Sequence, residues 1–160
     1  ARDKDGCQAI LMYCEMALYY FLRGLRLDEA MDNLYKRFGY HQDITYSMEF
    51  FGSEGQAKMD NLMNTMHNDP FITINGLKVV AVDDIEKQQH FEANGKVTPI
   101  NVPKANVVKL FLEDGSVVTV RPSGTEPKVK FYVGTKLKDK PKDNSFPEAL
   151  YKSIKETLHL

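Results

Sequence analysis

Seven short strand-like segments follow one another between residues 71 and 135, and they constrain the fold more than any other feature of the chain. Most of them are rich in β-branched or aromatic residues and are bounded by turn residues. The turns include Asn75-Gly76, Asn94-Gly95 and Asp114-Gly115, and the last pair is the signal for a two-residue hairpin. The predicted strands are Phe71–Ile74, Leu77–Val82, Gln88–Glu92, Lys96–Ile100, Asn106–Glu113, Ser116–Val120 and Val129–Thr135. Because short turns join antiparallel neighbours, this region predicts an antiparallel sheet.

Other patterns in the sequence add one strand and four helices. Residues 44–50 alternate between apolar and polar side chains, which predicts a strand with one buried face. Apolar residues at helical spacing predict one helix from Cys7 to Gly24 and a second from Leu27 to Gly39. Met59–Met66 predicts a third helix, and Ser145 starts a fourth.

The order of these elements predicts two parts. Residues 1–43 form a helical hairpin with a connector, and residues 44–160 form an α+β domain whose antiparallel sheet carries its helices on one face. The hairpin has one apolar side but is too short to close a core, so we expect it to be the end of a larger domain. Cys7 and Cys14 lie about 10 Å apart along a regular helix, too far for a disulfide. We expect both thiols to be buried and free, as suits a reducing cytoplasm.

The charge balance, the absence of long apolar runs and the spacing of the histidines exclude several kinds of partner. The chain has 21 Lys and Arg against 22 Asp and Glu, a net charge of −1, whereas a nucleic-acid-binding protein normally presents a basic face. No apolar run approaches the ~20 residues of a membrane span. The four histidines lack metal-ligand spacing. We therefore expect a cytoplasmic chain with no nucleic-acid partner, no membrane partner and no metal site in this part.

The segment RPSGTEPK, Arg121–Lys128, joins two predicted strands and has the composition of an anion-binding loop. Arg121 offers a planar fork of donors that suits paired phosphate oxygens. Ser123 and Thr125 add hydroxyls, and Gly124 lets the backbone approach an anion closely, with N–H groups turned inward as a nest. The two prolines fix φ, which reduces the entropy lost on binding. The same residue types occur in ordinary hairpin turns, so on chemistry alone a plain turn remains the alternative.

RPSGTEPK followed by VKFYVG resembles the phosphate-binding loop in the last domain of the α-D-phosphohexomutases, the superfamily of phosphoglucomutases and phosphomannomutases. The resemblance extends along the chain and looks closest to the bacterial phosphoglucomutase branch. The further matching segments are Arg2–Gly6 before a helix, the connector Phe38–His41, Val79–Asp84 and the LEDGS hairpin. The resemblance implies that residues 1–43 are the helical end of the third domain of such an enzyme, an α/β domain. It also implies that residues 44–160 are the fourth, C-terminal domain, with a TATA-binding-protein-like α+β fold.

The resemblance also implies an activity for the full-length protein. Enzymes of this superfamily interconvert hexose 1-phosphate and hexose 6-phosphate through a phosphoserine enzyme and a bisphosphosugar intermediate, and here glucose is the favoured hexose. Mg²⁺ would be held by the missing second domain, and a bisphosphosugar would act as activator. The present part would clamp the non-reacting phosphate of the phosphosugar substrate and would be inactive without the missing N-terminal domains. The alternative is a non-catalytic phosphosugar-binding or interaction module.

Site residues follow from the resemblance position by position. The substrate-phosphate clamp corresponds to Arg121, Ser123, Gly124 and Thr125. Lys4 corresponds to a family lysine beside the reacting phosphoryl group, where a cation stabilises the transferring charge or assists proton transfer. Between two aspartates, Lys4 also fits a solvated surface charge. Lys128 and Lys130 would add positive potential around the clamp, or would face plain solvent.

Overall fold

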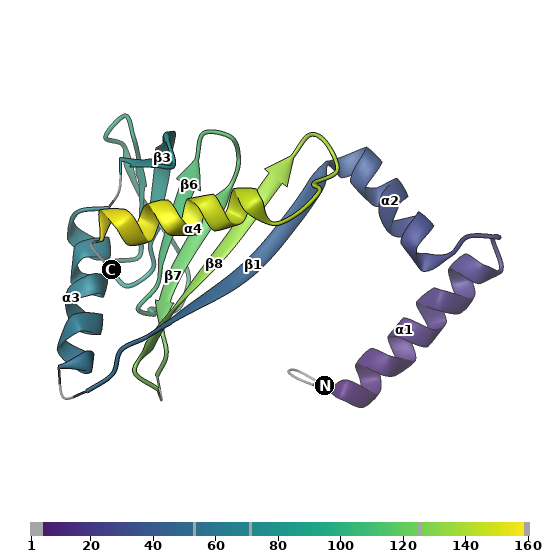
Figure 1. Ribbon diagram of the computed structural model, residues 1–160, viewed down its shortest axis with the longest axis horizontal. Coiled ribbons are helices and arrows are strands. Elements are labelled where there is room, and N and C mark those ends of the chain that lie inside the picture. The colour runs from purple at the N-terminus through teal and green to yellow at the C-terminus, as the bar shows by residue number, and fades with distance from the viewer. Residues whose placement is uncertain (1–4, 53, 71, 125, 159–160) are drawn as a thin grey trace. The chain divides into compact units, whose positions relative to one another are not determined.

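The computed structural model describes residues 5–52, 54–70, 72–124 and 126–158 (Figure 1). The chain divides into two compact units, Ala1–Tyr40 and His41–Leu160. This division comes slightly before the predicted boundary at residue 43, because the first strand, β1, already begins at Tyr40.

The larger unit is built on an eight-stranded sheet. Its strands are β1 (Tyr40–Glu49), β2 (Thr73–Ile74), β3 (Leu77–Asp84), β4 (Gln89–Glu92), β5 (Val97–Pro99), β6 (Val108–Leu112), β7 (Val117–Pro122) and β8 (Lys128–Leu137). They lie in the order β1-β8-β7-β6-β3-β4-β5, and β2 pairs with β3 beside this path. The pairs that join β2 through β8 are antiparallel. The predicted antiparallel sheet is therefore confirmed.

One face of the sheet is buried because alternate residues along its strands are apolar. On β8, Val129 and Phe131 have no exposed surface, whereas Lys128 and Lys130 lie on the opposite face and are half-buried. Two helices, α3 (Gly55–Asn68) and α4 (Ser145–Thr157), pack on the buried face (Figure 1). Their contribution to the core is Met59, Leu62, Met63, Met66, Leu150 and Ile154. The predicted arrangement, with helices on one face of the sheet, is confirmed.

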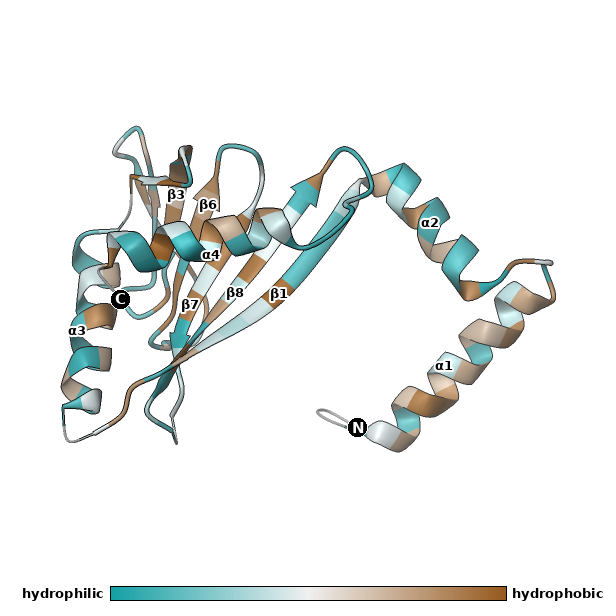
Figure 2. Ribbon diagram, in the orientation of Figure 1, coloured by the Kyte–Doolittle hydropathy of each residue, from teal (hydrophilic) through white to brown (hydrophobic). Residues whose placement is uncertain are grey.

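The smaller unit is a helical hairpin, α1 (Gly6–Phe21) and α2 (Leu27–Phe38), as predicted. The Asp5 carboxylate accepts the backbone N–H of Gln8 at 3.0 Å and so caps the start of α1. Apolar residues follow one another along α1 (Figure 2), yet none of its residues is buried. The predicted burial of Cys7 and Cys14 is wrong: both are exposed, because α2 alone does not cover the apolar side of α1.

A buried carboxylate ties the C-terminal end of α3 to the sheet. Asp84, the last residue of β3, is 2% exposed, and it accepts hydrogen bonds from His67 Nδ1 and from the Lys87 backbone N–H, both at 2.9 Å. The Lys87 ammonium lies 3.3 Å from the same carboxylate and also donates to the His67 carbonyl. Burial by itself would raise the pKa of Asp84, but the hydrogen bonds from Lys87 and His67 outweigh it and hold that pKa below its usual range.

We expect Asp84→Ala to destabilise the larger unit by about 1–3 kcal/mol, the cost of leaving buried partners unpaired. The pKa of Asp84 is lower in the folded chain than the value of about 3.9 in the unfolded chain. Its stabilisation is therefore present above that unfolded value and is lost as the pH falls through the lower folded value. Urea unfolding at a series of acidic pH values measures this: the variant should lose less stability in acid than the wild type. An equal acid dependence in the two proteins would contradict the prediction.

Candidate functional site

The candidate anion-binding loop is the hairpin turn between β7 and β8. β7 continues through Pro122 and β8 begins at Lys128, so the turn is shorter than the segment marked out by the sequence. Within the hairpin, the Ser123 N–H donates to the Lys128 carbonyl at 2.8 Å. From outside it, the Phe50 N–H donates to the Pro127 carbonyl at 2.8 Å. The turn is therefore held both by its own strands and by the segment that follows β1.

Arg121 and Lys130 lie directly opposite each other on β7 and β8. Their neighbours Val120 and Phe131 are in the core, so both cations project from the face that α3 and α4 leave open. Arg121 is exposed, and its guanidinium makes no hydrogen bond or ion pair with any residue that the structure describes. Opposed Cβ atoms on antiparallel strands lie about 4.5–5.5 Å apart, where like charges destabilise the pair. A bound anion would relieve this repulsion.

Ser123 and Gly124 occupy the turn itself, the first half-buried and the second exposed. A Cβ added to Gly124 would meet no atom within 4 Å, and Gly124 does not have a positive φ. The fold of the chain therefore does not require a glycine at this position. Ser123 does not have a positive φ either. Thr125, at the centre of the nest that the sequence suggested, lies outside the described residues, so the nest stays a prediction.

Two of the predicted site residues, Lys4 and Thr125, lie outside the described residues. Among the others, Lys128 forms an ion pair: its ammonium lies 2.5 Å from a Glu126 carboxylate oxygen. The hydrogen bond between them raises the pKa of Lys128 and lowers the pKa of Glu126. Lys130 is the predicted support residue that lies directly opposite Arg121. Its charge also helps to lower the pKa of Glu126, after the larger effect of Lys128. The pairing of Glu126 with Lys128 was not predicted from the sequence, although Glu126 stands in the motif two residues before Lys128.

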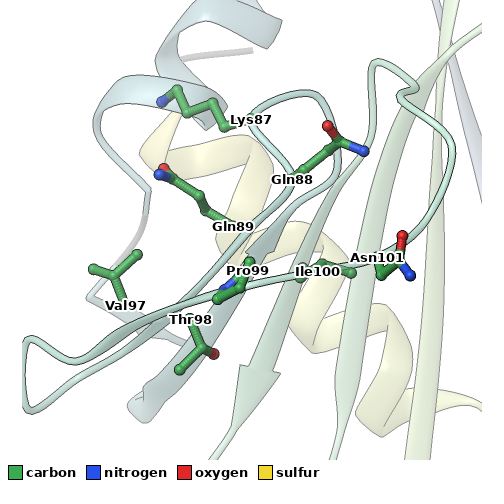
Figure 3. A pocket seen from close by; sticks show the side chains of 8 residues that line it. All are labelled: Lys87, Gln88, Gln89, Val97, Thr98, Pro99, Ile100 and Asn101. Carbon is green, nitrogen blue, oxygen red and sulfur yellow. The ribbon is translucent and has the colours of Figure 1, made fainter.

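A hollow of about 660 Å³ lies at the β4–β5 edge of the sheet, apart from the β7–β8 turn (Figure 3). Its lining residues are Lys87, Gln88, Gln89, Val97, Thr98, Pro99, Ile100 and Asn101. The cation among them, Lys87, is already bound to the Asp84 carboxylate and the His67 carbonyl. This hollow therefore offers a phosphate less uncompensated charge than the Arg121–Lys130 pair does.

Two other kinds of feature are absent from the part of the chain that the structure describes. No group of three or more His, Cys, Asp or Glu side chains there is arranged to hold a metal ion. No helix there is long and apolar enough to cross a membrane.

Comparisons with known proteins point to one family. Residues 75–151 match the family model described as the phosphoglucomutase/phosphomannomutase C-terminal domain. The chain is 35% identical over 136 residues to a phosphoglucomutase of Staphylococcus aureus (strain bovine RF122 / ET3-1), which covers 84% of this chain and 24% of that protein. It is also 35% identical over 133 residues to a phosphoglucomutase of Staphylococcus epidermidis (strain ATCC 12228 / FDA PCI 1200). That match covers 82% of this chain and 24% of the relative. The chain thus spans about a quarter of the length of these relatives.

A solved structure shows the same fold. It is the open form of the exocytosis-sensitive phosphoprotein pp63/parafusin, described as a phosphoglucomutase, from Paramecium, with a TM-score of 0.58 and 20% sequence identity. The match covers 99% of this chain and 27% of the Paramecium chain. The family model, the relatives and the fold agree, and the chain therefore belongs to the α-D-phosphohexomutase superfamily, as a C-terminal portion that includes the phosphoglucomutase/phosphomannomutase C-terminal domain.

Proposed function

We propose that the chain is the substrate-phosphate-binding portion of a cytoplasmic phosphohexomutase that interconverts hexose 1-phosphate and hexose 6-phosphate, with glucose as the favoured sugar. The full-length enzyme works through a phosphoserine and a bisphosphosugar intermediate. In this chain, Arg121, Ser123, Gly124 and Thr125 grip the phosphate that is not reacting. The relatives named phosphoglucomutase support this proposal, and so does the geometry of the β7–β8 hairpin.

The observation that carries the proposal is the Arg121–Lys130 pair. Two opposed cations on an uncovered sheet face, one of them exposed and without a partner in the described part of the chain, favour an anionic ligand. A guanidinium can give two parallel hydrogen bonds to a phosphate, and an ammonium adds a point charge. Ser123, two residues after Arg121 in the sequence, would add its hydroxyl.

A grip of this kind suits a mutase because it reads only the phosphate. The two ends of a bisphosphosugar must occupy the same grip in turn, so recognition cannot depend on which way the sugar faces. Holding the distant phosphate positions the reacting end and supplies binding energy for the chemical step.

The remaining parts of the proposal concern groups beyond the described residues. Mg²⁺ would be held by carboxylates of the full-length enzyme outside this chain, and it would neutralise charge on the transferring phosphoryl group. A bisphosphosugar activator would keep the serine phosphorylated. Lys4 would place a cation beside the reacting phosphoryl group.

We expect Arg121→Ala to weaken binding of glucose 1-phosphate by about 1.5–3 kcal/mol, the scale of a charge-assisted hydrogen bond. The free energy of unfolding should change by less than about 0.5 kcal/mol, because Arg121 is exposed. The measurement is an NMR titration of the 160-residue chain together with a urea unfolding curve. Lys152→Ala is the matched control, because Lys152 is an exposed cation on α4, which packs on the other face of the sheet. Equal affinity of wild type and Arg121→Ala would remove Arg121 from the site.

Gly124→Ala tests the close approach of the ligand separately from the charge. The added methyl group meets no atom of the chain, so stability should remain within about 0.5 kcal/mol of the wild type. If a phosphate lies against the backbone here, the methyl group should weaken phosphate binding several-fold in the same titration. Unchanged binding would place the phosphate away from Gly124.

The chain alone should not turn over substrate. Incubation of the 160-residue chain with glucose 1-phosphate, Mg²⁺ and a bisphosphosugar should yield no glucose 6-phosphate above the blank in a coupled assay. The phosphoserine and the metal ligands belong to other domains in the proposed mechanism. Sustained product formation would refute the assignment of this chain to the phosphate-binding portion.

A further inference from the structure

Phe51 is an exposed aromatic side chain beside the candidate phosphate grip, and the proposed function does not use it. Its side chain is 80% exposed, whereas Phe50, the residue before it, is 7% exposed and belongs to the core. Burying a phenylalanine side chain normally stabilises a folded protein. Because Phe51 is exposed, the chain alone lacks this stabilisation, and a ligand that covers the phenyl ring would supply it.

The residue before Phe51 has its backbone held by two contacts. The Phe50 N–H donates to the Pro127 carbonyl, and α3 begins against the backbone of Phe50. A Cβ added to Gly55, the first residue of α3, would lie only 2.6 Å from the Phe50 carbonyl oxygen. Between them, Gly52 turns the chain with a φ of 83°. Phe51 thus directly follows a residue, Phe50, that is held by both the β7–β8 turn and the start of α3.

Phe51 lines a cleft of about 170 Å³ together with Glu49, Glu126, Pro127 and Lys128. The phenyl ring and the proline supply an apolar wall, and the two glutamates supply hydrogen-bond acceptors. The Glu126 carboxylate has more acceptor positions than its ion pair with Lys128 uses. A sugar ring has the complementary chemistry, because its C–H face packs on an aromatic ring while its hydroxyls donate to carboxylates.

The cleft borders the phosphate grip. Lys128 stands two residues before Lys130 on β8 and on the same open face, a separation of about 6.6 Å along the strand. Lys130 is the residue opposite Arg121. A small polar ring that carries a phosphate can therefore occupy both places at once.

We propose that the cleft beside Phe51 holds the hexose ring of the phosphosugar, with the phenyl ring stacked on a C–H face of the sugar and Glu49 and Glu126 accepting its hydroxyls. This inference rests on the proposed function, since it takes the phosphate of the same molecule to lie at Arg121. The ring then has a contact of its own beside the phosphate grip, while the grip itself still recognises only the phosphate. The contact is apolar on one side, so it can accept the ring in more than one orientation.

The test compares two probes, inorganic phosphate and glucose 1-phosphate, in NMR titrations of the 160-residue chain. Phe51→Ala should lower the affinity for glucose 1-phosphate about five- to tenfold, the scale of an aromatic contact, and should leave the affinity for inorganic phosphate unchanged. Phe51→Tyr should retain wild-type affinity for both. Ile72→Ala is the matched control, because Ile72 is 83% exposed and lines a different hollow, with Val79 and Phe91. Unfolding curves should be the same for all variants.

The outcomes separate this inference from the proposed function. If Arg121→Ala weakens both probes and Phe51→Ala weakens neither, the phosphate grip stands and the sugar site is refuted. If Phe51→Ala weakens both probes equally, the residue acts on the turn through Phe50 and Pro127, which also refutes the sugar site. Wild-type protein that binds inorganic phosphate as tightly as glucose 1-phosphate refutes it too. If Arg121→Ala changes neither affinity, the proposed function itself fails.

Discussion

The pairing of β7 with β8 is the constraint on which both the core and the candidate site depend. Arg121 is opposite Lys130 and Val120 is opposite Phe131, so one register sends the apolar residues to α3 and α4 and the two cations to the open face. A slip of one residue would exchange the faces, because side chains alternate along a strand. The burial of Phe131 thus also specifies where Arg121 points. The core and the anion site are two sides of the same hydrogen-bonded ladder.

The turn at the end of this ladder is joined to a distant part of the chain. The Phe50 N–H binds the Pro127 carbonyl, and the Phe50 side chain is buried in the core. Because α3 starts directly against Phe50, the turn, the end of β1 and the start of α3 form one supported group. A site built on such supported backbone can hold a ligand in a defined geometry, since little has to be ordered when the ligand binds.

The sequence predicted the elements well because their signals are local. Alternating apolar residues and the Asp114-Gly115 turn marked the strands, and apolar residues at helical spacing marked the helices. The residue types of the motif at Arg121–Lys128 fit an anion site or a plain turn, and the resemblance to the phosphohexomutase loop favoured the anion site. The sequence did not show that Lys128 would be neutralised by Glu126 while Lys130 would face Arg121. Those relations depend on the register and on side-chain geometry, which the order of residues alone does not contain.

By itself, the sequence determined the set of strands and helices, the antiparallel character of the sheet and the residue types that the Arg121 turn presents. Each of these follows from the spacing of apolar residues, the turn residues or the motif itself. Only the tertiary structure decided that Asp84 would be buried against His67, 17 residues away, and that Phe51 would stand beside Glu126. It also decided that Cys7 and Cys14 would be exposed in this chain, since burial depends on which surface covers a helix. Contacts between distant segments arise from packing, and packing is settled only when all the elements are brought together.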